Sequence, residues 1–188
     1  MRLALLSLVL LFGTGAAAQP APELLAALRE GGYVLFLRHA STDFSQDDSR
    51  MTSFEDCTTQ RNLTDTGRAE ALALGEHIRR LKIPIGEVLA SPFCRTMETA
   101  RLAFGKARAT NDVRGGPLSA DDPKRYQPLR KLLGTRPLNG GNTVLSSHGN
   151  PFRAVAGPPY LAEGEIAVVR PEGGERFSVV ARIRLADW

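Results

Sequence analysis

The stretch of sequence that decides the fold is Tyr33-Val34-Leu35-Phe36-Leu37-Arg38-His39-Ala40. Residues 34–37 form an unbroken apolar run of strand length, which follows a pair of glycines. Such a run is typical of a strand buried on both faces in a mostly parallel sheet. Ligands of open α/β sheets bind beyond the carboxyl ends of the strands. Arg38 and His39 are therefore placed where a cation and an imidazole can bind and attack an anion. The alternative is an ordinary surface charge beside a loop histidine.

The first 18 residues have the layout of a secretory signal peptide. Arg2 supplies a positive charge, residues 3–12 are apolar, and a small-residue region ends in Ala16-Ala17-Ala18, where we expect cleavage. The apolar core is shorter than the roughly 20 residues of a spanning helix, so an uncleaved anchor is the weaker alternative. We therefore expect a signal peptide at 1–18 and one domain at 19–188, periplasmic or secreted, with no stable membrane insertion after cleavage.

The charge pattern argues against nucleic-acid binding. The formal charge is +4 at pH 7. The arginines that supply most of it are scattered, with no basic run and no interleaved aromatic residues. A mild positive balance helps to attract anionic substrates. We therefore expect a small anionic ligand and no nucleic-acid partner.

The chain has two cysteines, Cys57 and Cys94. In an oxidising compartment pairing is the default, and two cysteines allow one pairing. Chain-entropy estimates give such a loop roughly 3–4 kcal/mol of stabilisation. Two buried free thiols are the alternative. The CxxC and HxxxH spacings of zinc sites are absent from the sequence, so we expect no metal site.

Capping signals and apolar spacing predict alternating elements in the first half of the mature chain. We expect a helix over 21–30, a long polar loop over 41–59, a helix that begins near Thr64, and a short strand at 88–90. Ser91-Pro92 then gives an N-cap followed by a first-turn proline, which predicts another helix. Arg95 would lie in its first turn, where free amides and a guanidinium together suit a bidentate phosphate clamp. An exposed helix arginine is the alternative.

The second half of the chain predicts a second strand that ends in histidine. We expect a short strand within 107–114, a helix from Asp121-Asp122-Pro123 to about residue 133, and a strand over 143–148. Asn150-Pro151 repeats the cap-then-proline signal, and residues 165–169 and 177–185 read as two closing strands. His39 and His148 thus both follow strands at positions where a ligand binds, which indicates a two-histidine site.

Four motifs, in order along the chain, resemble those of the histidine phosphatase superfamily, in its phosphoglycerate-mutase-like branch. Arg38-His39-Ala40 is similar to the Arg-His-Gly signature, with Ala in place of Gly. Residues 62–71 resemble the Leu-Thr-x-x-Gly-x-x-Gln-Ala helix start, residues 91–100 the Ser-x-x-x-Arg-x-x-x-Thr-Ala block, and 148–150 the second-histidine block. Together they span almost the whole mature chain.

The resemblance implies an α/β fold, a three-layer αβα sandwich with a mostly parallel mixed sheet. It implies that His39 forms a phosphohistidine, which splits the reaction into two easier steps. Arg38, Arg95 and His148 would hold the phosphoryl oxygens and stabilise the transition-state charge. The resemblance implies neither a cofactor nor a metal. With the motifs placed in this way, a disulfide between the two cysteines would tie the loop at 41–59 to the helix that carries Arg95.

The general acid that protonates the leaving oxygen has no match in these motifs. In larger relatives it comes from the segment between the clamp arginine and the second histidine, which is short here and offers Asp121 and Asp122. We place Glu163 first, because its turn follows the second histidine and enters the next strand at the pocket rim. An ordinary loop carboxylate is its alternative. Some short relatives have no evident acid and act on labile phosphoramidates, so the acid can also be missing.

The function that we predict is that of an exported phosphomonoesterase, a metal-independent histidine phosphatase that acts on a small phosphorylated substrate. One alternative is a non-catalytic module that binds a phosphorylated ligand on the same fold. A phosphomutase is the less favoured alternative, because the substrates of a glycolytic mutase are cytoplasmic. The sequence makes no prediction about oligomeric state.

Overall fold

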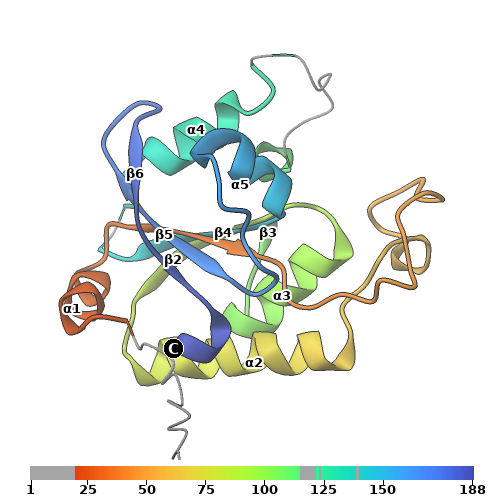
Figure 1. Cartoon of the computed structure of the whole chain (residues 1–188), viewed down its shortest axis with the longest axis horizontal. Coiled ribbons are helices and arrows are strands. Elements are labelled where there is room, and N and C mark those ends of the chain that lie inside the picture. Colours follow the sequence, from red (N-terminus) through yellow and green to blue (C-terminus); the bar gives the residue numbers. More distant parts are fainter. Residues whose placement is uncertain (1–19, 115–121, 123, 139) are drawn as a thin grey trace, which may run out of the picture.

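A six-stranded mixed sheet forms the centre of the computed structural model, which describes residues 20–114, 122, 124–138 and 140–188 (Figure 1). Its order is β3-β2-β4-β1-β5-β6, with parallel pairing from β3 to β1 and antiparallel pairing from β1 to β6. The strands are β1 (Val34–Arg38), β2 (Ile85–Ala90), β3 (Arg108–Ala109), β4 (Asn142–Ser147), β5 (Ile166–Pro171) and β6 (Phe177–Ile183). The sheet is therefore mixed and mostly parallel, as predicted.

Helices cover both faces of this sheet. In Figure 1, α4 and α5 lie above it and α2 and α3 lie below it. The elements are α1 (Pro22–Glu30), α2 (Asp65–Arg80), α3 (Cys94–Phe104), α4 (Gln127–Gly134) and α5 (Gly149–Ala156), with the 3-10 turns η1 (Cys57–Thr59), η2 (Asn111–Val113) and η3 (Leu185–Asp187). The predicted three-layer αβα sandwich is confirmed. The proposed signal peptide lies outside the described residues, and within them every helix is too short or too polar to cross a bilayer.

The apolar run in β1 is explained by burial on both faces. All four of its apolar side chains are fully buried, and they alternate between two cores because successive residues of a strand point to opposite faces. Leu35 and Leu37 pack with residues of α1, α2 and α3, whereas Val34 and Phe36 pack with residues of α4 and α5. β1 is thus the strand that holds the two layers of helices together.

The helix after β2 begins later than Ser91-Pro92 predicts. It starts at Cys94, with Phe93 as the N-cap residue. The Ser91 amide instead donates to the Ser146 carbonyl at 2.9 Å, which continues the sheet, and its hydroxyl lies 2.9 Å from His148 Nε2. The hydroxyl that would have capped the helix is therefore engaged by a site residue.

Two other helix starts also differ from the prediction. Asp122 forms a tight turn, in which its carboxylate accepts from the Lys124 amide at 2.8 Å, so α4 begins only at Gln127. Residues 121 and 123 lie outside the described part of the chain. In the other case His148 is the N-cap residue of α5, and the predicted cap at 150 falls within the first turn.

Helices α2 and α3 approach each other closely at Gly75. A Cβ atom at this position would lie 2.2 Å from the carbonyl oxygen of Ala103. That oxygen belongs to the backbone of α3, so it cannot move aside as a flexible side chain would. The absence of a side chain at Gly75 therefore sets the distance between the two helices that support the site from below.

We predict that Gly75→Ala destabilises the protein by about 1–3 kcal/mol, the usual cost of overpacking. The clash with Ala103 should outweigh the gain of roughly 1 kcal/mol in helix propensity. Urea denaturation measures the difference. Gly86→Ala is the matched control, because the nearest atom to its new Cβ would be 3.5 Å away, and its stability should change little. Equal stability of the two variants would contradict the close approach.

Candidate active site

The parallel strands β1 and β4 end side by side and bring two histidines together. The His39 amide donates to the Ser147 carbonyl at 3.0 Å, directly before His148. The two imidazole rings meet edge to face, with their centroids 5.5 Å apart. Both rings line a cavity of about 280 Å³ at this end of the sheet, close to the lower limit of roughly 300 Å³ for small-ligand pockets. The predicted two-histidine site thus has room for a compact ligand.

His39 is a neutral imidazole with one nitrogen left for chemistry. The residue is 1% exposed, and its Nδ1 lies 2.9 Å from the carbonyl oxygen of Ala40. A carbonyl only accepts hydrogen bonds, so Nδ1 carries the proton and Nε2 keeps its lone pair. Burial lowers the pKa of His39 to about 3; the hydrogen bond to Ala40 opposes this shift, and the charges of Arg95 and Arg38 add to it. Nε2 is therefore a free nucleophile at neutral pH.

Ala40 stands where the family signature has glycine. Its side chain is almost fully buried, in a small cluster with Leu63 and Ala71, and its amide donates to Thr99 Oγ1 at 3.2 Å. The methyl group fills space that a glycine would leave open. An alanine is therefore accommodated at the position whose carbonyl accepts from His39 Nδ1.

His148 is held from two sides. Its Nε2 lies 2.9 Å from Ser91 Oγ, and the Phe93 ring packs edge to face against the imidazole at 5.0 Å. Burial lowers the pKa of His148 well below its usual value, and the charge of Arg95 lowers it further. His148 is thus a second neutral histidine, and Nδ1 is the ring nitrogen left for a ligand.

Three arginines of the cavity share an unusual feature. Arg38, Arg61 and Arg95 all line the cavity, and the Nε atom of each is buried without a hydrogen-bond partner among the described residues. A buried charged donor without a partner is costly, so such groups normally meet an acceptor. Three of them around one cavity indicate that the acceptor is an oxyanion.

Asp48 determines which edge of Arg95 faces a ligand. The carboxylate binds Nη1 and Nη2 of Arg95, both at 3.0 Å, and Nη1 also donates to the Arg61 carbonyl at 3.2 Å. The Nε–H and the remaining Nη2–H form the free edge, and two parallel donors suit a phosphoryl group. Burial lowers the pKa of Arg95, while the hydrogen bond and charge of Asp48 raise it. Asp48 therefore both orients the guanidinium and stabilises its positive charge.

Glu163 lies beside the histidine rather than in the cavity lining. Its carboxylate accepts from the Thr42 amide at 3.1 Å, from Thr42 Oγ1 at 2.8 Å and from Arg38 Nη2 at 3.3 Å. It also lies 3.9 Å from His39 Nδ1, the side of the ring opposite to the nucleophilic nitrogen. A general acid must face the leaving group. The predicted acid role does not fit this arrangement, and Glu163 instead orients Arg38 and His39.

Of the two alternative acids, Asp122 does not supply a replacement. Asp122 forms the turn before α4 and is not in the cavity lining, while Asp121 lies outside the described residues. Among the described residues that line the cavity, none carries a carboxylate. In the same part of the chain, no cluster of three or more histidine, cysteine or acidic side chains is arranged to hold a metal ion.

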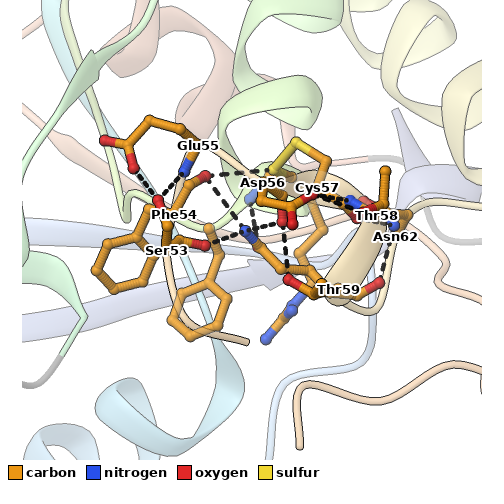
Figure 2. Close-up of a disulfide and its surroundings, with 12 residues drawn as sticks. Ser53, Phe54, Glu55, Asp56, Cys57, Thr58, Thr59 and Asn62 are labelled. Atoms are coloured by element: carbon orange, nitrogen blue, oxygen red, sulfur yellow. Dashed lines mark hydrogen bonds between the residues drawn. A yellow bond between two sulfur atoms is a disulfide. The ribbon is translucent and has the colours of Figure 1, made fainter. Parts of the chain in front are cut away.

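The predicted disulfide between Cys57 and Cys94 is confirmed, with the Cα atoms 5.8 Å apart. It joins Cys57, the first residue of η1 (Figure 2), to Cys94, the first residue of α3. The buried Gln60 side chain adds to this junction: its Nε2 faces the carbonyls of Ser53 and Phe54, and its Oε1 accepts from the Cys94 amide at 3.0 Å. The loop that carries Asp48 is therefore fixed to the helix that carries Arg95.

Sequence reasoning missed Arg61 and Asp48. Arg61 directly precedes a motif that was recognised, but neither strand position nor capping singles it out. Asp48 is one of several acidic residues in a loop without periodicity. Its pairing with Arg95 joins residues 47 positions apart, and no local pattern reports such a contact.

Comparison with known proteins finds one family that matches part of the chain. Residues 34–115 match the histidine phosphatase superfamily (branch 1). This match covers the part of the chain that runs from β1 to just beyond η2. The matched range holds the first histidine and the clamp arginine, whereas His148 lies beyond it. A search of curated protein sequences finds no significant match.

Solved structures share the histidine phosphatase fold at low sequence identity. The protein histidine phosphatase SixA, complexed with tungstate, aligns with a TM-score of 0.58 at 17% identity, over 82% of this chain and 98% of that chain. The mycobacterial glucosyl-3-phosphoglycerate phosphatase Rv2419c, complexed with inorganic phosphate, gives 0.57 at 18% identity, over 83% and 99%. A protein from Thermus thermophilus, TTHB049, gives 0.54 at 20% identity, over 81% and 99%.

We predict that Asp48→Asn weakens the binding of inorganic phosphate by about tenfold, the worth of one charge-assisted hydrogen bond. An amide presents a single acceptor oxygen and no charge, so Arg95 loses its orienting partner. Isothermal titration calorimetry measures the affinity. Asp47→Asn removes the same charge from an exposed neighbour and should leave binding unchanged. Tighter binding by Asp48→Asn would instead mean that Asp48 competes with phosphate for Arg95.

Stability should depend on pH through His39. An unfolded histidine binds a proton below about pH 6.5, whereas folded His39 binds one only near pH 3. Between these values the unfolded state holds the extra proton, so the free energy of unfolding falls as the pH drops. Near pH 5, His39→Gln should reduce this slope by about 1.4 kcal/mol per pH unit. Urea denaturation from pH 7 to pH 4.5 tests this, and an unchanged slope would show that folded His39 titrates normally.

Proposed function

We propose that this chain is an exported phosphatase that transfers a phosphoryl group from a small phosphorylated substrate to His39 and then to water. The observation that supports this most directly is the arrangement around His39. A neutral imidazole with a free Nε2 lines the same cavity as three arginines whose buried Nε atoms have no partner among the described residues. The match of residues 34–115 to the histidine phosphatase superfamily supports the same reaction.

In the first step, the lone pair of His39 Nε2 attacks phosphorus, and the bond from phosphorus to the leaving oxygen breaks. The leaving oxygen keeps that electron pair and takes a proton from solvent. In the second step, water attacks the phosphohistidine, the phosphorus–nitrogen bond breaks, and its electron pair returns to Nε2. The attacking water loses a proton to solvent, and inorganic phosphate leaves.

The cavity side chains suit the charge of this reaction. The phosphoryl oxygens carry the negative charge of the transition state, and fixed donors in a water-poor site stabilise it strongly. Arg38, Arg61 and Arg95 supply the guanidinium donors, and His148 supplies a ring nitrogen. Asp48 and Glu163 hold Arg95 and Arg38 from behind, so these donors are oriented before the substrate binds.

Glu163 and Ala40 have a role on the other face of the nucleophile. When Nε2 attacks phosphorus, the imidazole ring becomes positively charged. The Ala40 carbonyl accepts from Nδ1, and the Glu163 carboxylate lies 3.9 Å from that nitrogen. Both groups stabilise the positive ring, in the manner of the carboxylate behind a catalytic histidine in a serine protease.

Export is supported by two independent features. The first 18 residues have the charge and hydropathy of a signal peptide. The cysteines form a disulfide within the domain, and disulfides persist in oxidising compartments such as the periplasm or the extracellular space.

The proposed reaction predicts that the protein hydrolyses an aryl phosphate, and that His39→Ala abolishes turnover by at least about 10³-fold through loss of the nucleophile. The assay is run on the mature protein with EDTA in the buffer. His77→Ala, which lies on α2 outside the cavity, is the control and should be fully active. Phosphate binding without turnover would favour the non-catalytic module instead. Equal turnover by His39→Ala would show that His39 is not the nucleophile.

The cavity lining also predicts how the rate depends on the leaving group. Because no carboxylate lines the described cavity, the leaving oxygen departs with most of its negative charge, and a better leaving group should react much faster. A series of substituted aryl phosphates measures the slope of log kcat/KM against leaving-group pKa. We expect a steep negative slope. A flat dependence would reveal an acid that protonates the leaving oxygen.

A further inference from the structure

The cavity holds more positive charge than one phosphoryl group can contact. Besides the three arginines around His39, two further arginines line it, Arg114 and Arg125, together with Tyr126. They come from the segment between β3 and α4, which carries none of the residues of the proposed reaction. Their presence calls for a separate explanation.

Arg114 is held at the cavity by several contacts. The preceding residue, Val113, is fully buried, and its carbonyl accepts from the hydroxyl of Ser147, the last residue of β4. Arg114 Nε donates to Asn111 Oδ1 at 3.1 Å, and its guanidinium stacks on the Phe54 ring at 5.2 Å. The strand that positions His148 therefore also positions Arg114, with the Nη edge of its guanidinium left for a ligand.

The two carboxylates beside the site pair with Arg95 and Arg38 and not with Arg61 or Arg114. Asp48 and Glu163 form ion pairs with Arg95 and Arg38, respectively. Within the described part of the chain, neither Arg61 nor Arg114 has a carboxylate within ion-pair distance. Arginines gathered in one cavity repel one another, and an anion with several charges relieves that repulsion.

We propose that Arg114 and Arg125 form a second anion subsite, and that the substrate carries a second phosphoryl group close to the one transferred to His39. This inference rests on the proposed function, because His39 defines which group is transferred. The cavity, about 280 Å³ in volume, requires the two groups to be near neighbours, as in a diphosphate or a vicinal bisphosphate. Such a diphosphoryl group could belong to a soluble molecule or to the head group of a lipid.

Binding of two non-hydrolysable probes tests the subsite without relying on turnover. Calorimetry on the mature protein compares methylphosphonate, which has one phosphoryl-like group, with methylenebisphosphonate, which has two. We expect the second probe to bind at least roughly tenfold more tightly, the worth of one or more charge-assisted hydrogen bonds. Arg114→Gln combined with Arg125→Gln should abolish this preference and leave methylphosphonate binding unchanged.

A control variant has the same total charge as the Arg114/Arg125 variant but leaves the cavity intact. Arg153→Gln combined with Arg170→Gln removes two exposed arginines outside the cavity and should retain the preference. Equal affinity of the unmodified protein for both probes, or a preference that survives in the Arg114/Arg125 variant, would overturn the subsite. Failure to bind either probe would overturn the proposed function as well, whereas a preference in a protein without turnover would overturn only the catalytic step.

A second experiment distinguishes a lipid head group from a soluble molecule as the carrier of the diphosphoryl group. The protein is sedimented with vesicles that contain a polyprenyl diphosphate, and in parallel titrated with free pyrophosphate. Sedimentation that is lost in the Arg114/Arg125 variant would support the subsite and assign it to a lipid head group. Binding of free pyrophosphate without sedimentation would support the subsite and assign it to a soluble substrate.

Discussion

The pairing of β1 with β4 is the constraint on which the site depends. These neighbouring strands run parallel, in a register that sets Arg38 opposite Ser147, and each is followed by a histidine. A shift of one residue would exchange the apolar side chains of β1 between the two cores, where their sizes would no longer match the space. The four buried residues of β1 therefore fix the register, and the register fixes the distance between His39 and His148. The burial of the β1 side chains and the placement of the two histidines therefore both depend on the pairing of β1 with β4.

A second constraint acts through the loop after β1. That loop leaves the sheet beside the site and extends past the end of α2 (Figure 1), yet it supplies Asp48 to Arg95 and the backbone carbonyl of Arg61 to the same guanidinium. A long polar loop does not hold such geometry through apolar burial. The disulfide at Cys57 and the buried amide of Gln60 supply the attachment instead. An oxidising compartment would therefore serve the orientation of a phosphate ligand as well as stability.

The sequence predicted the layers, the strand that carries the first histidine, and the two histidines as one site, because these follow from local patterns. An apolar run, a glycine pair and a strand end are visible within a few residues. It misplaced the start of α3, since the hydroxyl of Ser91 is engaged by His148, which is 57 residues away. It placed Glu163 at the pocket rim as the first candidate acid, whereas the carboxylate binds Thr42 and Arg38 and lies 3.9 Å from His39 Nδ1. A turn can be placed from sequence, but the direction of its side chain depends on Thr42 and Arg38, which pack against it only in the folded chain.

The central claim is that His39 Nε2 attacks phosphorus while Nδ1 stays bound to the Ala40 carbonyl. The most direct measurement is the position of phosphate on the protein after rapid mixing with an aryl phosphate and quenching under conditions that preserve phosphohistidine. Tandem mass spectrometry identifies the residue, and phosphorus NMR identifies the ring nitrogen. The account predicts a phosphoryl group on Nε2 of His39. Phosphate on Nδ1, phosphate on His148, or steady turnover with no phosphorylated histidine would contradict it.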